Sequence, residues 1–133
     1  MTPARPSGIL ETALYVADLE RAARFYQATL GFQVMVSGDR LIALAAAEQQ
    51  VLLLFKQGAS ATLPVGSHDG DGRLHLAFAI PAADLTTWED HLGRQGIEIE
   101  ERRVWERGGT SVYFRDPDGN LVELATPGVW PNY

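Results

Sequence analysis

The sequence contains no cysteine, and this absence removes several kinds of chemistry. Without cysteine there is no disulfide framework, no thiolate nucleophile and no cysteine-based zinc site. The chain also lacks an apolar run near the roughly 18 residues that span a bilayer, and no apolar signal segment follows its first residues. We therefore expect a cytoplasmic protein in which His, Asp or Glu must hold any bound metal.

An excess of basic charge is missing as well. The chain has 11 Lys and Arg against 17 Asp and Glu, a formal net charge of -6. No basic surface is therefore expected for nucleic acid or an anionic membrane. The chain is 46% hydrophobic and 21% charged, which is typical of a globular protein, and its 133 residues fit one domain or two very small modules.

Strand, helix and turn signals occur twice in the same order. In each half a strand is followed by an Asp that could cap a helix, Asp18 or Asp84. Apolar residues at helical spacing come next, and a Gly, Gly31 or Gly96, is expected to end the helix. Trp88 lies on the second stripe and is expected in the core. The strands are expected at residues 9–16, 32–37, 41–46, 51–56, 74–80, 97–101 and the two arms of 110–125.

This repeat predicts an α+β fold of two βαβββ modules in tandem, with a curved mixed sheet around a central cavity and helices outside. The predicted parts are a flexible arm at 1–8, modules at 9–57 and 74–126, a linker at 58–73 and a tail at 127–133.

The stretch from Thr110 to Ala125 is the strongest local signal. Asp116-Pro117-Asp118-Gly119 is typical of a tight turn, and apolar residues alternate on both sides of it. Alternation places Glu123 on a face shared with apolar residues, where a carboxylate is costly to bury without a positive partner.

Three polar residues on the predicted cavity faces form a candidate metal site. Glu11 and His75 occupy equivalent strand positions in the two modules, and Glu123 lies on a neighbouring strand. Two carboxylates and one imidazole suit Mn²⁺, Mg²⁺ or Fe²⁺, with Zn²⁺ and Ni²⁺ also open, and leave free coordination positions. The alternative is that each is a separate structural residue.

Several other side chains are candidates for substrate contact. Alternation directs Tyr15, Ser111 and Tyr113 to the cavity faces, and Tyr113 is also a catalytic candidate. Trp105 is either an aromatic wall or a cover for a sheet edge. Arg107, beside two glycines, either approaches an anionic substrate or is solvated. His68, with Asp69, is a minor general-base candidate in the linker.

The chain resembles the vicinal oxygen chelate superfamily, which includes glyoxalase I, fosfomycin-resistance thiol transferases, bleomycin-resistance proteins and extradiol dioxygenases. The resemblance covers nearly the whole chain and rests on residues 14–19, Phe25-Tyr26, 30–32, 75–78, 113–120 and Glu123. It implies that Glu11, His75 and Glu123 are metal ligands, with Glu11 where relatives most often have His. Glyoxalase I has a fourth ligand near the position of Leu53, so the three-ligand layout is nearer to the fosfomycin-resistance enzymes.

The resemblance implies a metal-dependent enzyme whose cation polarises an oxygen of a small electrophilic substrate, in an isomerase, lyase or thiol-transferase step. The alternatives are a metal-free small-molecule binding protein of the bleomycin-resistance kind and an Fe²⁺ extradiol dioxygenase. A homodimer is also implied.

Overall fold

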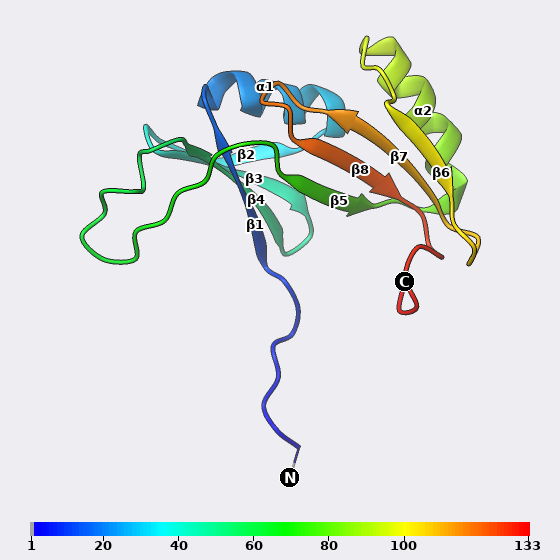
Figure 1. The fold of residues 1–133 in the computed structure, drawn as a ribbon, viewed down its shortest axis with the longest axis horizontal. Coiled ribbons are helices and arrows are strands. Elements are labelled where there is room, and N and C mark those ends of the chain that lie inside the picture. Colours follow the sequence, from blue (N-terminus) through cyan, green and yellow to red (C-terminus); the bar gives the residue numbers. More distant parts are fainter. Residues whose placement is uncertain (1) are drawn as a thin grey trace. The chain divides into compact units, whose positions relative to one another are not determined.

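The computed structural model describes residues 2–133 and contains two compact units, the first ending at Asp71 and the second beginning at Gly72. The boundary falls inside the predicted linker. Each unit has one four-stranded mixed sheet. In Figure 1 the strands of the first unit are coloured from blue to teal and those of the second from green to red-orange. The α+β class and the tandem βαβββ order are therefore confirmed. The cavity shared by the modules stays a prediction.

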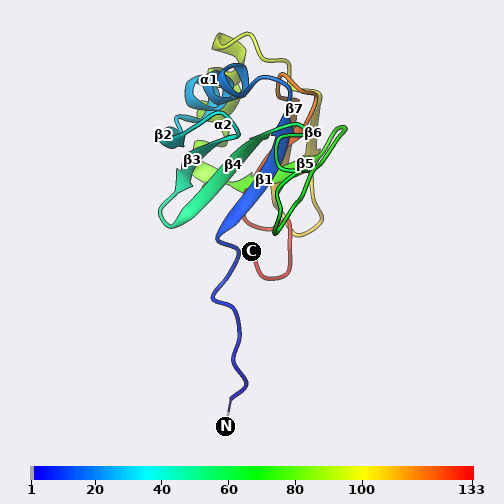
Figure 2. The ribbon, with the colours of Figure 1, turned by 90° about the vertical axis from the view of Figure 1, so that its left-hand side faces the viewer.

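The first unit contains one helix and four strands. Its elements are β1 (Glu11–Val16), α1 (Leu19–Leu30), β2 (Gln33–Ser37), β3 (Leu41–Ala47) and β4 (Gln50–Lys56), and its strand order is β1-β4-β3-β2. β1 runs parallel to β4, and Figure 2 shows these two strands side by side. Asp18 caps α1 by accepting from Arg21 N at 3.0 Å, and Gly31 ends it at φ 74°. Both helix boundaries were predicted from the sequence.

Alternation along β1 separates a buried face from an open face. Leu14 and Val16 are 1% and 0% exposed, on the face that also holds Leu54 of β4. The helix α1 packs against β2, β3 and β4. Each such buried aliphatic side chain contributes about 1.5–3 kcal/mol of hydrophobic stabilisation. Glu11 and Tyr15 share the opposite face, as predicted.

The second unit repeats this order with a short 3₁₀ turn before its helix. Its elements are β5 (His75–Ala79), η1 (Ala82–Asp84), α2 (Leu85–Arg94), β6 (Glu101–Val104), β7 (Thr110–Arg115) and β8 (Leu121–Ala125), with strand order β5-β8-β7-β6. Its core includes Leu76, Leu92, Val112, Phe114, Val122 and Leu124.

Three local predictions in the second unit were wrong. Asp84 makes no side-chain cap, because η1 already places it in the right-handed helical conformation. The strand expected at residues 97–101 lies at Glu101–Val104. Trp88 is half-buried, and Leu92 is the buried residue of α2.

Among residues 2–133, no helix combines the length and apolar character needed to cross a membrane.

Candidate functional site

The site in the second unit is built on the hairpin of β7 and β8. The turn has the predicted form: Gly119 has φ 84°, and its N–H donates to the carbonyl of Asp116 at 3.0 Å. Arg115 Nη1 donates to the carbonyl of Gly119 at 3.0 Å. This geometry fixes the register in which Tyr113 lies directly opposite Glu123.

The same turn positions the start of β5. Asn120 is completely buried, and its Oδ1 accepts from the backbone N–H of Leu74 at 2.9 Å. Its Nδ2 donates to Asp116 Oδ2, also at 2.9 Å. Leu121 N donates in turn to the carbonyl of Leu74 at 2.8 Å. His75, the next residue, is therefore held beside β8 by the hairpin turn, a role of Asn120 that the sequence analysis missed.

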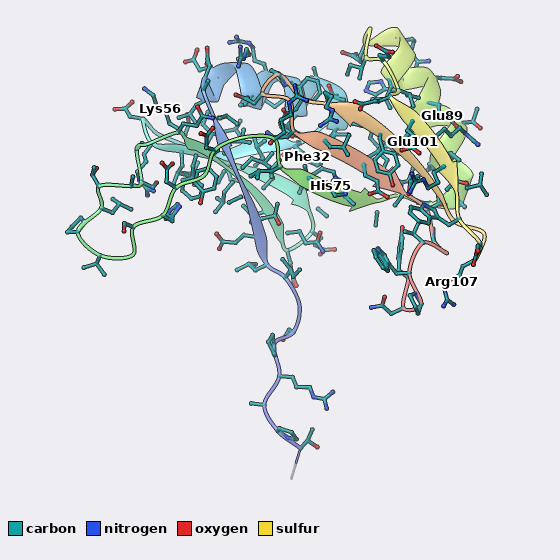
Figure 3. The ribbon with its side chains drawn as sticks, viewed as in Figure 1. Phe32, Lys56, His75, Glu89, Glu101 and Arg107 are labelled. Atoms are coloured by element: carbon teal, nitrogen blue, oxygen red, sulfur yellow. The ribbon has the colours of Figure 1, made fainter. Side chains whose placement is uncertain are left out.

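His75 and Glu123 contact each other through defined atoms. Nε2 of His75 lies 3.2 Å from Oε1 of Glu123, while Nδ1 lies 2.9 Å from the carbonyl oxygen of Leu121. The Glu123 side chain is 9% exposed and the His75 side chain is 50% exposed. One side of the pair is thus enclosed by the sheet and the other is open. Figure 3 labels His75 on β5.

The hydrogen-bond pattern around His75 determines what the pair can do. A carbonyl oxygen only accepts, so Nδ1 must carry a hydrogen. In a neutral imidazole the lone pair of Nε2 then faces an oxygen of the carboxyl group at 3.2 Å. Two acceptors at this distance need a hydrogen or a cation between them, so a proton shared by the two atoms and a metal ion bound by both are the two solutions. A ring nitrogen that donates to a backbone carbonyl is the usual support of a metal-bound histidine.

The second carboxylate oxygen of Glu123 has a different partner. Ser111 Oγ donates to Oε2 at 2.5 Å, and Trp105 Nε1 donates to Ser111 Oγ at 2.9 Å. Ser111 is fully buried. Its hydroxyl, predicted to contact substrate, is therefore engaged within the protein.

Tyr113 and Arg103 complete the polar face. Burial raises the pKa of Tyr113, and the nearby Glu123 carboxylate raises it further, so Tyr113 remains a neutral phenol. Arg103 lies opposite Ser111, with its guanidinium 5.0 Å from the centre of the Trp105 ring. Its hydrogen bond to Glu101 raises the pKa of Arg103. The sequence analysis missed Arg103 because the strand was placed too early.

Arg107 lies in the loop that joins β6 to β7. It is exposed in the turn between β6 and β7, as Figure 3 shows. The substrate contact assigned to Arg107 stays a prediction, and the position favours the solvated alternative.

In the first unit Tyr15 already has a partner. Its hydroxyl lies 2.8 Å from Nδ1 of His68, and both rings contact Phe55. Gly70 lies against the same ring, since a Cβ there would approach Tyr15 Cδ2 to 2.2 Å. The predicted linker is therefore an ordered segment folded over Tyr15. His68, a minor candidate in the sequence, is the residue that binds the Tyr15 hydroxyl.

Glu11 is exposed at the start of β1, opposite Val51 of β4. Leu53 lies opposite Ala13, so the position of a possible fourth ligand is apolar. Within residues 2–133, no group of three or more His, Cys, Asp or Glu side chains forms a recognisable metal cluster. Glu11 belongs to the first unit and His75 and Glu123 to the second, and the three-ligand set stays a prediction.

The chain contains two βαβββ units in tandem. The sheet of the second unit carries a His–Glu pair that neighbouring hydrogen bonds hold in place. These features define the class of protein with tandem βαβββ modules. The sequence matches the model of the Glyoxalase/Bleomycin resistance protein/Dioxygenase superfamily over residues 8–124. The chain belongs to this superfamily.

Individual relatives carry different activities in their names. Virulence protein STM3117 of Salmonella typhimurium is 32% identical over 84% of this chain and 78% of its own length. Metallothiol transferase FosB of Staphylococcus epidermidis is 30% identical over 84% and 75%. Catechol-2,3-dioxygenase of Bacillus subtilis is 32% identical over 84% of this chain, but only 38% of the dioxygenase is covered.

Among solved structures, a lactoylglutathione lyase from Agrobacterium tumefaciens superposes with a TM-score of 0.89 at 32% identity, covering 96% of this chain and 99% of the lyase. The fold and family are thus established.

Proposed function

We propose that this protein is a metal-dependent enzyme in which Glu11, His75 and Glu123 hold a divalent cation against an oxygen of a small electrophilic substrate. The observation that carries the proposal is the contact of His75 Nε2 with Glu123 Oε1 at 3.2 Å, with Nδ1 donating to a backbone carbonyl. The names of relatives support it, since they include a metallothiol transferase and a lactoylglutathione lyase.

The donor set fits a divalent cation such as Mn²⁺, Fe²⁺, Ni²⁺, Zn²⁺ or Mg²⁺. Imidazole nitrogen and carboxylate oxygen are ordinary ligands for these ions, and three protein ligands leave positions open to substrate. When bound, the cation supplies Lewis acidity toward a carbonyl, epoxide or similar group. The half-exposed His75 leaves the pair accessible.

The surrounding residues have separate tasks in this proposal. The buried hydroxyl of Ser111 and the carbonyl of Leu121 fix the orientations of Glu123 and His75. Tyr113 lies opposite Glu123, and its raised pKa keeps a hydrogen on its hydroxyl at neutral pH. We assign Tyr113 to donate that hydrogen to a substrate oxygen as negative charge develops there.

A metal-free binding protein that stacks a cationic ligand on Trp105 fits the site less well. The Trp105 ring already lies under the guanidinium of Arg103, 5.0 Å from the ring centre. That position is the one a bound cation would take over an aromatic face.

The test is metal binding followed by a reaction screen. Chelator-treated protein is titrated with each of the five ions by calorimetry, and bound metal is counted by elemental analysis. We expect His75→Ala and Glu123→Gln to lose binding, while the matched controls His91→Ala and Glu98→Gln keep it. A bound ion at 100 times its Kd should stabilise the wild type by about 2.7 kcal/mol.

The preferred ion then selects the reactions to be screened. These are isomerisation of hemithioacetals, thiol addition to epoxides, and oxygen uptake with catechols. Equal metal binding by the wild type, His75→Ala and Glu123→Gln would contradict the proposal, as would a wild type that binds no ion.

A further inference from the structure

Trp105 and Ser111, outside the predicted ligand set, connect the β6–β7 loop to Glu123. The indole N–H can only donate, so at 2.9 Å it donates to Ser111 Oγ. The serine hydroxyl then directs its own hydrogen to Glu123 Oε2, at 2.5 Å. The direction of both hydrogen bonds is thus fixed by the chemistry of the indole.

This chain of hydrogen bonds gives the two oxygens of Glu123 different partners. Oε2 is bound to a serine that is completely buried, whereas Oε1 faces the half-exposed His75. A partial rotation of the carboxylate would break the bond from Ser111 and leave the buried hydroxyl hydrogen without an acceptor, which is costly. Only Oε1 is therefore presented on the open side.

The C-terminal tail packs against the β6–β7 loop that carries Trp105. Trp105 N donates to the carbonyl of Gly109 at 2.8 Å. A Cβ on Gly109 would lie 2.5 Å from the backbone of Gly128, so the loop and the tail cross at two glycines. Tyr133 anchors the tail, because its hydroxyl donates to the carbonyl of Ala125 at 2.8 Å. The indole therefore projects from a braced loop.

We propose that Trp105 and Ser111 are positioning residues that make Glu123 a one-oxygen metal ligand through Oε1. The inference rests on the proposed function, because it assigns how one ligand of that site is oriented. It gives the otherwise unexplained burial of the Ser111 hydroxyl a role at the site. With a cation held through Oε1 alone, one more coordination position would be free for substrate than with a two-oxygen carboxylate.

Removing the serine hydroxyl should weaken metal binding more than it weakens the fold. We expect Ser111→Ala to lower the affinity for the preferred ion by about tenfold to a hundredfold, the usual effect of losing a partner behind a metal ligand. Trp105→Phe removes one hydrogen bond a step further away, and should cost about fivefold. Ser111→Thr keeps the hydroxyl and should restore most of the affinity.

Matched controls separate positioning from general damage. Ser67→Ala lies in an exposed loop, and Trp88→Phe lies on α2, so both should bind metal as the wild type does. The metal-free melting temperature is measured for every variant. A purely structural role for Ser111 would lower that temperature in Ser111→Ala without changing the affinity of the protein that remains folded.

Tryptophan fluorescence gives a second readout. In a background with Trp88→Phe and Trp130→Phe, Trp105 is the sole tryptophan, because the chain has three. Metal binding should change its emission in that background, and adding Ser111→Ala should abolish the change.

These experiments distinguish a failure of the positioning role from a failure of the proposed function. A wild type that binds no metal would overturn both proposals together. A wild type that binds metal, with Ser111→Ala binding equally tightly and Trp105 emission still responding, would overturn the positioning role alone. Lower affinity in Ser111→Ala with rescue by Ser111→Thr is the result we expect.

Discussion

At the scale of single residues, the site depends on which atom of each side chain is not already hydrogen-bonded within the protein. His75 uses Nδ1 on the carbonyl of Leu121, and Glu123 uses Oε2 on Ser111. What remains is one nitrogen and one oxygen, 3.2 Å apart. The Leu121 carbonyl and the Ser111 hydroxyl thus leave His75 and Glu123 with one free atom each, directed at one another.

Gly70 gives a residue-scale prediction about the first unit. A Cβ at this position would lie 2.2 Å from Tyr15 Cδ2, on a ring whose hydroxyl is held by His68. We expect Gly70→Ala to destabilise the protein by about 1–3 kcal/mol, as overpacking does. Denaturant unfolding measures the change.

The matched control is a glycine with room for a side chain. Gly93 lies in α2, and a Cβ there would meet nothing within 4 Å. Gly93→Ala should therefore stabilise the protein by about 0.4–1 kcal/mol. If Gly70→Ala left the stability unchanged or raised it, the packing of residues 58–71 over Tyr15 would be contradicted.

At the scale of elements, an ion pair joins Glu100, the residue before β6, to Arg115 of the hairpin. Arg115 donates to Glu100 from Nε at 2.8 Å and from Nη2 at 3.1 Å. This hydrogen bonding holds the pKa of Glu100 below its ordinary value of 4.5. Both side chains are exposed, so the pair is screened by salt and its contribution is small.

The lowered pKa of Glu100 predicts how the contribution depends on pH. A carboxyl with a depressed folded-state pKa stabilises the fold above its unfolded value, and this stabilisation is lost as pH falls through the folded value. Glu100→Gln should therefore be less stable than the wild type at pH 7, and the difference should close below about pH 4.5.

Thermal melts across pH 3–7 would measure this effect. Glu98→Gln, two residues earlier, should follow the wild type at every pH. A stability gap for Glu100→Gln that stayed constant with pH would contradict an ionic origin.

Local signals in the sequence predict most elements but not the position of β6 in the second unit. Asp18 and Gly31 mark the ends of α1, and the 116–119 turn predicts the hairpin, because these residues act within a few positions. Ile97 and Ile99 alternate like a strand, yet the β6 ladder with β7 begins at Glu101. The exposed charges of β6 suit an edge strand. Because β6 lacks alternating apolar residues, a search for hydrophobic alternation does not detect it.

The site was predictable in part for the same reason. Alternation correctly places Ser111, Tyr113 and Glu123 on one face. The contact between Trp105 and Ser111 depends on the β6–β7 register and its loop, which no short motif determines. The hydrogen bond from Leu74 N to Asn120 Oδ1 joins residues 46 positions apart, and no local pattern in the sequence predicts it.

At the scale of the whole molecule, two βαβββ units divide the proposed ligands between them. The second unit supplies His75 and Glu123 in contact, and the first supplies Glu11 at the equivalent strand. The superfamily hosts several activities on this fold, so the donor set rather than the fold must select the chemistry.

The most direct test of this account is the number of divalent ions bound by the wild type, Glu11→Gln and Glu123→Gln, counted by elemental analysis with each of Mn²⁺, Fe²⁺, Ni²⁺, Zn²⁺ and Mg²⁺. The account predicts one ion of the preferred kind per chain in the wild type and loss of tight binding in both variants, because Glu11 and Glu123 both belong to the proposed ligand set. A wild type that binds none of the five ions, or undiminished binding by either variant, would contradict it.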